Sequence, residues 1–160
     1  MPKLSAGLLL YRVRDGVVEV LIAHPGGPFW ARKDDGAWSI PKGEYAHGED
    51  PWAAAQREFA EEVGSAPPAG PRVDLAPVKQ PGGKVVTAFA VPGDLDPGNA
   101  YSNTFELEWP RGSGQMRTFP EVDRVEWFPV AQARAKLLKG QLALLDQLMA
   151  DPGLAGLQEG

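Results

Sequence analysis

The stretch of this sequence that decides the fold runs from residue 43 to residue 65 and reads GEYAHGEDPWAAAQREFAEEVGS. Asp50 is a favourable helix N-cap, and Pro51 suits the first helical position. Gly64 suits a left-handed C-terminal cap, because glycine pays no steric penalty there. These signals predict a helix over Pro51–Val63.

Three carboxylates of this predicted helix share one face, because Glu58, Glu61 and Glu62 stand at i, i+3 and i+4. An apolar stripe lies roughly 110° around the helix, so burying it on a sheet leaves the acids at the margin of a groove. No Lys or Arg lies four residues after any of the three. A hard cation such as Mg²⁺ or Mn²⁺ would neutralise them, whereas the alternative is a solvated acidic face. The apolar stripe consists of Trp52, Ala55, Phe59 and Val63.

Length and composition limit the number of domains, the possible chemistry and the possible partners. A chain of 160 residues is predicted to form one domain over 1–150, with a frayed tail at 151–160. The absence of cysteine excludes a disulfide framework, thiolate zinc sites and a cysteine nucleophile. Apolar runs are too short to span a membrane, so we expect a cytoplasmic protein. The net charge of -5 argues against nucleic acid as a partner.

Runs of apolar and β-branched residues separated by turn signals predict a sheet with helices on its faces, which is the α+β class. Residues 3–13 and 17–23 form the predicted first hairpin, joined through Arg14-Asp15-Gly16. Residues 25–36 and 111–117 are predicted loops. The other predicted strands are 73–79, 84–91, 101–109 and 124–128, and the predicted terminal helices are 131–139 and 141–150.

The 23-residue stretch resembles the signature of the Nudix hydrolase family, G-x5-E-x7-R-E-U-x-E-E-x-G-U, where U is a bulky apolar residue. Two positions depart from it, since Phe59 is aromatic where an aliphatic residue is usual and Ser65 is polar. Neither change touches an acidic position. The seven fixed positions are filled by Gly43, Glu49, Arg57, Glu58, Glu61, Glu62 and Gly64.

This resemblance implies an α/β/α sandwich with a central mixed sheet and a loop-helix-loop metal site. It also implies Mg²⁺ or Mn²⁺ as cofactor, bound by Glu58, Glu61, Glu62 and the main-chain carbonyl of Lys42. Such a cation neutralises phosphate oxygens and lowers the pKa of a bound water. The expected reaction is therefore hydrolysis of a diphosphate linkage in a nucleoside diphosphate derivative, such as a dinucleoside polyphosphate or a nucleoside triphosphate.

The same resemblance assigns supporting roles around the acids. Arg57 is expected to act in catalysis by pairing with Glu49, which fixes where the carboxylates point. The stretch from Trp38 to Gly43 is similar to that of the family's dinucleoside polyphosphate hydrolases. It makes Lys42, Gly43 and Trp38 candidates for substrate binding, and Gly64 a structural support. The other candidates are Trp30, Phe29 and Tyr101 for base stacking, and Arg32, Lys33, Lys79 and Lys84 for phosphate contacts.

The general base has two candidates. Glu61 lies inside the 23-residue stretch, whereas Glu121 follows the polar loop, from which a mobile segment would swing a carboxylate over the site. Glu106 and Glu108 alternate along a predicted strand and therefore share one face, which solvent would cover. The two histidines, His24 and His47, are interpreted as structural.

Two functions of different classes follow from this reading, and an isomerase or glycosylase variant of the fold is a third, less favoured option. A hydrolase acting on a small nucleotide is favoured, because every acidic position of the signature is filled. The alternative is a non-catalytic nucleotide-sensing module on the same fold. Either would act as a monomer or homodimer, and neither calls for a membrane. The leaving group and the base preference depend on loop residues whose arrangement the sequence does not specify.

Overall fold

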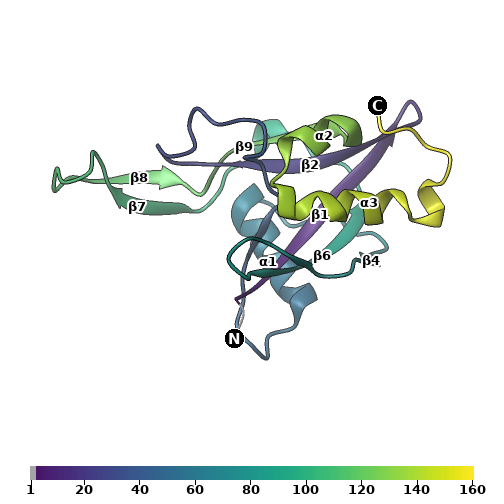
Figure 1. Cartoon of the computed structure of the whole chain (residues 1–160), viewed down its shortest axis with the longest axis horizontal. Helices are drawn as coiled ribbons and strands as arrows, with labels where there is room; N and C mark the ends of the chain where they lie inside the picture. Colours follow the sequence, from purple (N-terminus) through teal and green to yellow (C-terminus); the bar gives the residue numbers. More distant parts are fainter. Residues whose placement is uncertain (1–2) are drawn as a thin grey trace.

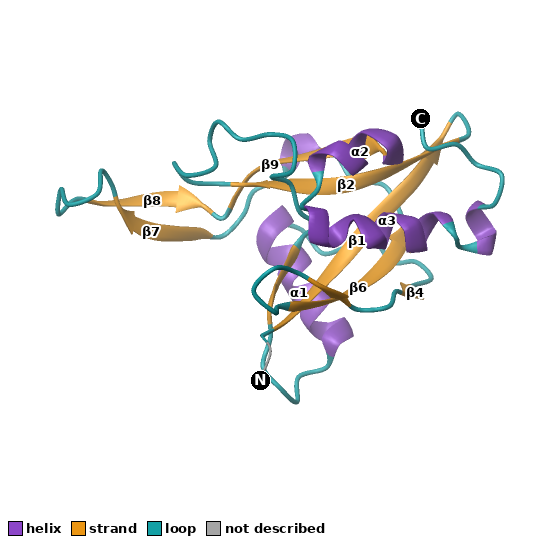
Figure 2. Cartoon of the chain, in the orientation of Figure 1, coloured by secondary structure: helices purple, strands orange, loops and turns teal. Residues whose placement is uncertain are grey.

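The computed structural model describes residues 3–160, and its main feature is one seven-stranded mixed sheet (Figures 1 and 2). The central order is β4-β6-β1-β2-β9, with β3 paired to β1 and β5 paired to β6. Strands β1 and β6 run parallel, and the other pairs are antiparallel. The strands of this sheet are β1 Leu4–Arg14, β2 Val17–Pro25, β3 Lys42–Glu44, β4 Val73–Asp74, β5 Val78–Lys79, β6 Val85–Pro92 and β9 Val122–Pro129.

Helices cover both faces of the sheet, which confirms the predicted α/β/α sandwich (Figure 2). Helix α1 (Pro51–Val63) packs against one face, where Leu8 and Leu10 of β1 point toward it. Helices α2 (Val130–Lys136) and α3 (Leu142–Met149) pack on the other face, against Leu9. Successive residues of a strand point to opposite faces, so β1 supplies both halves of the core.

Helix α1 has the predicted bounds and the predicted caps. The Asp50 side chain accepts a hydrogen bond from the amide of Ala53 at 3.0 Å, which satisfies one free N–H of the first turn. Gly64 ends the helix with φ of 90°, and its amide donates to the carbonyl of Ala60 at 2.9 Å. The helix is therefore fixed at both ends, and its buried face anchors it on the sheet. That face consists of Ala54, Ala55, Phe59 and Val63.

A two-stranded ribbon projects from the body of the molecule (Figure 1). Strands β7 (Thr104–Glu108) and β8 (Met116–Pro120) pair only with each other. The predicted strand over 101–109 is thus shorter than expected, and part of the predicted loop 111–117 is strand β8. Likewise, 73–79 forms two short strands, β4 and β5, instead of one. These errors arise where pairing partners, not local propensity, define the strand.

The last ten residues are packed on the body, so the predicted frayed tail is wrong. The turn η3 (Pro152–Leu154) buries Leu154, and the amide of Val18 donates to the carbonyl of Gln158 at 2.9 Å. Arg134 also holds Glu159 through a 2.7 Å ion pair. A buried leucine and strand-like hydrogen bonds therefore fix this segment.

The terminal helices are shorter than predicted. Helix α2 ends at Lys136, and the turn η2 (Lys139–Gln141) separates it from α3 around the predicted break at Gly140. A further short turn, η1 (Pro97–Asn99), precedes the ribbon. Over residues 3–160, none of the helices has the length and apolar composition to cross a bilayer.

Candidate active site

The acids of helix α1 open onto a cavity of about 410 Å³ at the edge of strand β3. Glu58, Glu61 and Glu62 all line it, so the predicted acidic face is directed at a cavity and not only at bulk solvent. The strand contributes Lys42 and Gly43 to the same wall. The remaining residues of the cavity are Ser5, Glu44, Lys84, Asn103 and Glu121.

Gly43 allows helix α1 and strand β3 to approach closely. A Cβ at this position would overlap the carboxylate of Glu58, so any other residue would displace that side chain. Glu58 is itself only 12% exposed, which leaves it little room to move. The glycine therefore helps to define where the Glu58 carboxylate lies.

Arg57 binds three of the neighbouring glutamates. It pairs with Glu49 at 3.0 Å, as the resemblance implied, and it donates to Glu58 at 2.8 Å. The same guanidinium lies 3.7 Å from Glu61, an i, i+4 pair. Arg57 therefore supplies a protein cation at helical spacing, four residues before Glu61, where the sequence analysis had considered only the positions after each acid. Arg57 ties the loop before α1 to two of the three acids.

Glu62 differs from the other acids because it is more buried and lies against the backbone of β3. Its Oε1 accepts a hydrogen bond from the amide of Lys42 at 3.3 Å. Burial raises the pKa of Glu62 to about 8, and the negative charges of Glu58 and Glu121 add to this effect. Burial and the charge of Glu61 likewise raise the pKa of Glu58. The cavity thus holds carboxylates whose ionisation is opposed by their surroundings.

The donor set of this cavity fits a hard divalent cation in its chemistry. Glu58, Glu61, Glu62 and Glu121 all present oxygen ligands to one space, and a cation there would offset the burial and mutual repulsion of the carboxylates. Within residues 3–160, however, no three acidic, histidine or cysteine side chains form a ready-made metal cluster. A cation would therefore bind by drawing these side chains together, with rotation about their side-chain bonds.

The structure places Glu121 in the cavity but not on a mobile loop. It joins β8 to β9, its amide donates to the carbonyl of Asn103 at 2.8 Å, and its carbonyl accepts from Gly26 at 2.9 Å. The predicted swing is therefore wrong, because the backbone is held on both sides. Glu106 and Glu108 are exposed residues of β7 on the projecting ribbon and are not among the residues that line the cavity.

Trp38 cannot bind substrate, which corrects the sequence prediction. It is 1% exposed and packs edge-on against His24 and Phe128, while its indole donates to Asp34 at 2.8 Å. Trp30, eight residues earlier, does reach a second cavity of about 230 Å³. That cavity is mostly apolar, and it adjoins the acidic one, since Lys42, Glu62 and Glu121 line both. The other residues of this apolar cavity are Ala23, Pro25, Ala37, Ser39, Val122 and Leu138.

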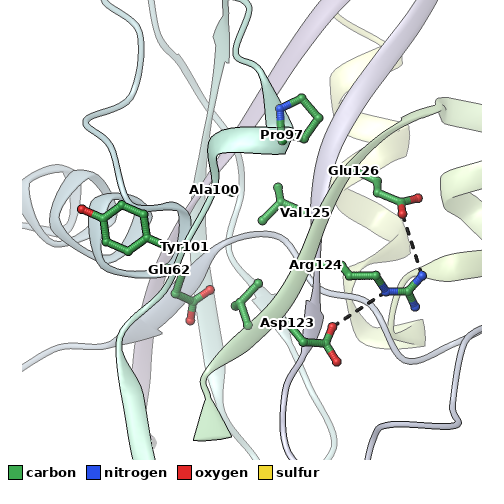
Figure 3. A pocket seen from close by; sticks show the side chains of 10 residues that line it. Glu62, Pro97, Ala100, Tyr101, Asp123, Arg124, Val125 and Glu126 are labelled. Carbon is green, nitrogen blue, oxygen red and sulfur yellow. Dashed lines mark ion pairs between the residues drawn. The ribbon is translucent and has the colours of Figure 1, made fainter.

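A third pocket, of about 260 Å³, lies beyond the acids between the η1 segment and strand β9 (Figure 3). Glu62 stands at its edge, and Arg124 of β9 pairs with Asp123 and Glu126. Tyr101 also lines this pocket, and its ring is 72% exposed. Phe29 is also exposed. Of the two rings, only that of Tyr101 belongs to a residue lining one of the three cavities described for residues 3–160.

His24 has a structural position, as interpreted from the sequence. Its ring is fully buried, and its two nitrogens lie 2.8 Å from Asp123 Oδ1 and 2.6 Å from the carbonyl of Lys33. Both ring nitrogens are therefore engaged, and His24 holds the loop after β2 onto the sheet. His47 lies in the exposed loop before α1.

Sequence reasoning missed Ser5, Glu44 and Asn103 as parts of the cavity. Ser5 and Asn103 come from segments distant from α1 in the chain, so no local spacing relates them to the acids, whereas Glu44 lies inside the 23-residue stretch without filling one of its fixed positions. Ser5 carried one faint signal, because it is a polar residue followed directly by the small and apolar run Ala6–Leu10.

Comparison with known proteins extends the resemblance to the Nudix family beyond the 23-residue signature to most of the chain. The NUDIX domain profile matches residues 1–148. An RNA pyrophosphohydrolase from Rhodospirillum rubrum is 47% identical over 66 residues, which is 40% of this chain and 39% of that protein. The chain therefore matches only about two-fifths of the length of this relative.

Solved structures share the fold at low sequence identity. An Ap4A hydrolase from C. elegans, solved as a binary complex, superposes with a TM-score of 0.61 and 22% identity over 97% of this chain and 99% of that one. The NUDIX domain of NrtR from Shewanella oneidensis, solved with ADP ribose, gives 0.60 and 18% over 92% and 86%. The three-layer fold with one acidic helix at the edge of its sheet is the class of domain that these structures share. The profile match then makes the assignment specific: the chain belongs to the Nudix family.

Proposed function

We propose that this protein is a divalent-metal-dependent pyrophosphohydrolase that cleaves a diphosphate linkage in a small nucleotide. The observation that carries this proposal is the cavity shared by Glu58, Glu61, Glu62 and Glu121, two of which are held at raised pKa by burial and crowding. A bound divalent cation would relieve the burial and the mutual repulsion of the ionised carboxylates, so this cavity favours cation binding. Membership of the family and the names of the relatives point to the same chemistry.

The metal would be held by Glu58, Glu61 and Glu62, with the main-chain carbonyl of Lys42 as a further oxygen ligand. When bound, Mg²⁺ or Mn²⁺ supplies charge to the phosphate oxygens and makes a bound water more acidic. Arg57 and Gly43 orient the acids, the first through ion pairs and the second by leaving room for Glu58. Preorganised ligands of this kind reduce the cost of assembling the site.

The proton of the attacking water would pass to Glu121. This carboxylate has no ion-pair partner among residues 3–160, whereas Glu61 already lies 3.7 Å from Arg57. The backbone on both sides of Glu121 is hydrogen-bonded, so the side chain is presented from a fixed position. A fixed acceptor close to the reacting water is what general-base catalysis requires.

The nucleoside would occupy the apolar cavity beside the acids. Trp30 offers a flat ring, and Pro25 and Leu138 supply further apolar surface. Because Glu62 and Glu121 line both cavities, a ligand lying across them would have its phosphates at the acids and its base at Trp30. This arrangement favours a nucleotide over a bare polyphosphate.

The test is a screen of nucleoside triphosphates, dinucleoside polyphosphates, ADP-ribose and 5′-triphosphate RNA with Mg²⁺ or Mn²⁺, resolving the products by chromatography. We expect cleavage of at least one of these within its diphosphate linkage, and no cleavage in excess chelator. The matched control is Glu106→Gln, which removes an exposed carboxylate outside the cavity. Tight binding of one of these nucleotides with no product in either metal would instead favour the nucleotide-sensing module.

A further inference from the structure

The ring of His24 lies between two hydrogen-bond acceptors. His24 is fully buried one residue before the end of β2, and its ring packs edge-on against Trp38 with centroids 5.2 Å apart. Nδ1 lies 2.8 Å from Asp123 Oδ1, and Nε2 lies 2.6 Å from the carbonyl oxygen of Lys33. A carbonyl oxygen and an ionised carboxylate can only accept a hydrogen bond. Each ring nitrogen therefore has to donate.

A ring that donates through both nitrogens carries two protons and a positive charge. The same two protons could also be shared by a neutral ring and a protonated Asp123. That arrangement is unfavourable because the Asp123 side chain is 32% exposed and lies 3.9 Å from Arg124 Nε, and water and a guanidinium both favour the ionised carboxyl (Figure 3). A single ring proton would leave two acceptors facing each other in a buried place, which costs free energy. The geometry therefore favours an imidazolium paired with a carboxylate.

The contact between His24 and Lys33 closes the loop segment that carries Trp30. At the start of this segment, the amide of Gly26 donates to the carbonyl of Glu121 at 2.9 Å. At its end, the amide of Lys33 donates to the carbonyl of Trp30 at 3.0 Å, and the carbonyl of Lys33 accepts from His24. Trp30 lines the apolar cavity between these two anchors. Because His24 holds one of the anchors, it restrains where the Trp30 ring lies.

The contact between His24 and Asp123 holds an irregular point of strand β9. The residues of β9 paired with the end of β2 are Arg124 and then Val122, so Asp123 is an extra residue that forms a β-bulge. A bulge bends its strand and changes the direction of the neighbouring side chains. Glu121 directly precedes β9 and lines the acidic cavity. The ion pair with Asp123 therefore fixes the backbone from which the Glu121 side chain projects.

We propose that His24 is a positioning residue, whose doubly protonated ring holds the Trp30 loop through one nitrogen and the bulge beside Glu121 through the other. The roles of Trp30 as nucleoside contact and of Glu121 as general base rest on the proposed function, whereas the two ring protons do not. The two contacts then serve different steps. The contact to Lys33 supports nucleotide binding, and the contact to Asp123 supports proton transfer.

The ring protons are tested by NMR spectroscopy of the ¹⁵N-labelled protein at neutral pH. The chain has two histidines, so His24→Gln assigns the ring signals by removing one set. We expect two protonated ring nitrogens for His24, with slow exchange against solvent because the ring is buried. Detection of a single protonated nitrogen in His24 overturns the proposal.

The two contacts are separated by two substitutions. The amide nitrogen of asparagine occupies the place of Nδ1, and that of glutamine occupies the place of Nε2. His24→Asn therefore keeps the bond to Asp123 and loses the bond to Lys33, and it should raise KM about tenfold with little change in kcat, since the loop must be ordered on binding. His24→Gln keeps the bond to Lys33 and should lower kcat about 10- to 100-fold with little change in KM, because Glu121 is misplaced.

The control is His47→Gln in the exposed loop before α1, which should leave kcat, KM and the melting temperature unchanged. Both His24 variants should melt lower than the parent, so the kinetics are measured at a temperature at which all the proteins are folded. Equal changes of KM and kcat in the two His24 variants, as a merely structural histidine would give, overturn the division of roles. If no nucleotide is cleaved, the proposed function fails, and the NMR signals still decide whether the ring holds both contacts.

Discussion

The buried carboxyl of Glu62 should make the metal-free protein less stable as the pH rises. A group whose pKa is raised by folding holds its proton more tightly in the folded state than in the unfolded chain. Its contribution is therefore favourable at low pH and is lost as the pH rises from 4.5, its ordinary value, toward the folded pKa of about 8. The substitution that exposes this effect is Glu62→Gln, which keeps the size and can still accept from the Lys42 amide.

The size of the effect follows from the shift. One pKa unit corresponds to about 1.4 kcal/mol, so a rise to about 8 sets an upper limit of about 5 kcal/mol above pH 8. Structural relaxation and water entry reduce burial penalties in real proteins, and we expect about 1 to 2 kcal/mol of the difference to appear between pH 5 and pH 8. Over that range the free energy of unfolding of Glu62→Gln should gain this amount relative to the parent.

The assay is urea denaturation of both proteins at pH 5 and pH 8 in chelator, because comparing two proteins at each pH cancels the titration of the other groups. Glu106→Gln, an exposed change on the ribbon, should follow the parent at both values. Adding Mg²⁺ at pH 8 should raise the parent's free energy of unfolding and should raise that of Glu62→Gln less. A difference between parent and Glu62→Gln that is the same at both pH values refutes the assignment of a buried, crowded carboxyl.

Three other substitutions test separate parts of the site. Gly43→Ala should lower turnover by about 10²-fold by displacing the Glu58 carboxylate, with the melting temperature recorded to show that the fold persists. Glu121→Gln should lower kcat by about 10² to 10⁴-fold at saturating metal, and a variant within a few-fold of the parent beside an inactive Glu61→Gln would move the base to α1. Trp38→Ala should cost about 3 to 5 kcal/mol of unfolding free energy in urea titrations, and a loss below 1 kcal/mol would contradict its core position.

The acidic half of the site was predictable because its geometry is local. Asp50 and Gly64 set the ends of α1 within one continuous stretch, and the spacing of Glu58, Glu61 and Glu62 places them on one face whatever surrounds the helix. Arg57 was foreseen as a partner of Glu49 from the resemblance, but its contact with Glu58 was not. A side chain that long reaches neighbours that a rule based on i, i+4 order alone does not consider.

The part of the cavity that the sheet contributes was predictable only for Lys42, Gly43 and Lys84, because strand pairing brings the other residues there. Ser5 meets Glu44 through the β1–β3 register, and β6 brings Lys84 beside Glu44 through its parallel pairing with β1. A shift of one residue in either register would turn these side chains to the other face. Register depends on the whole sheet, so the spacing of residues along the chain does not reveal which polar groups will share a cavity.

The two tryptophans of the loop after β2 show the same limit for single residues. Trp30 and Trp38 have the same side chain and stand near the same predicted loop, yet one lines a cavity and the other is core. Ser39 bridges to Ala23 and Trp38 bridges to Leu137, which places the Trp38 ring under α2. Within residues 3–160 Trp30 makes no such bridge, and it lines a cavity together with Glu121. Tertiary contacts therefore decide which ring can contact a nucleobase. The aromatic residue types alone do not predict the substrate, because the same side chain is buried at one position and lines a cavity at the other.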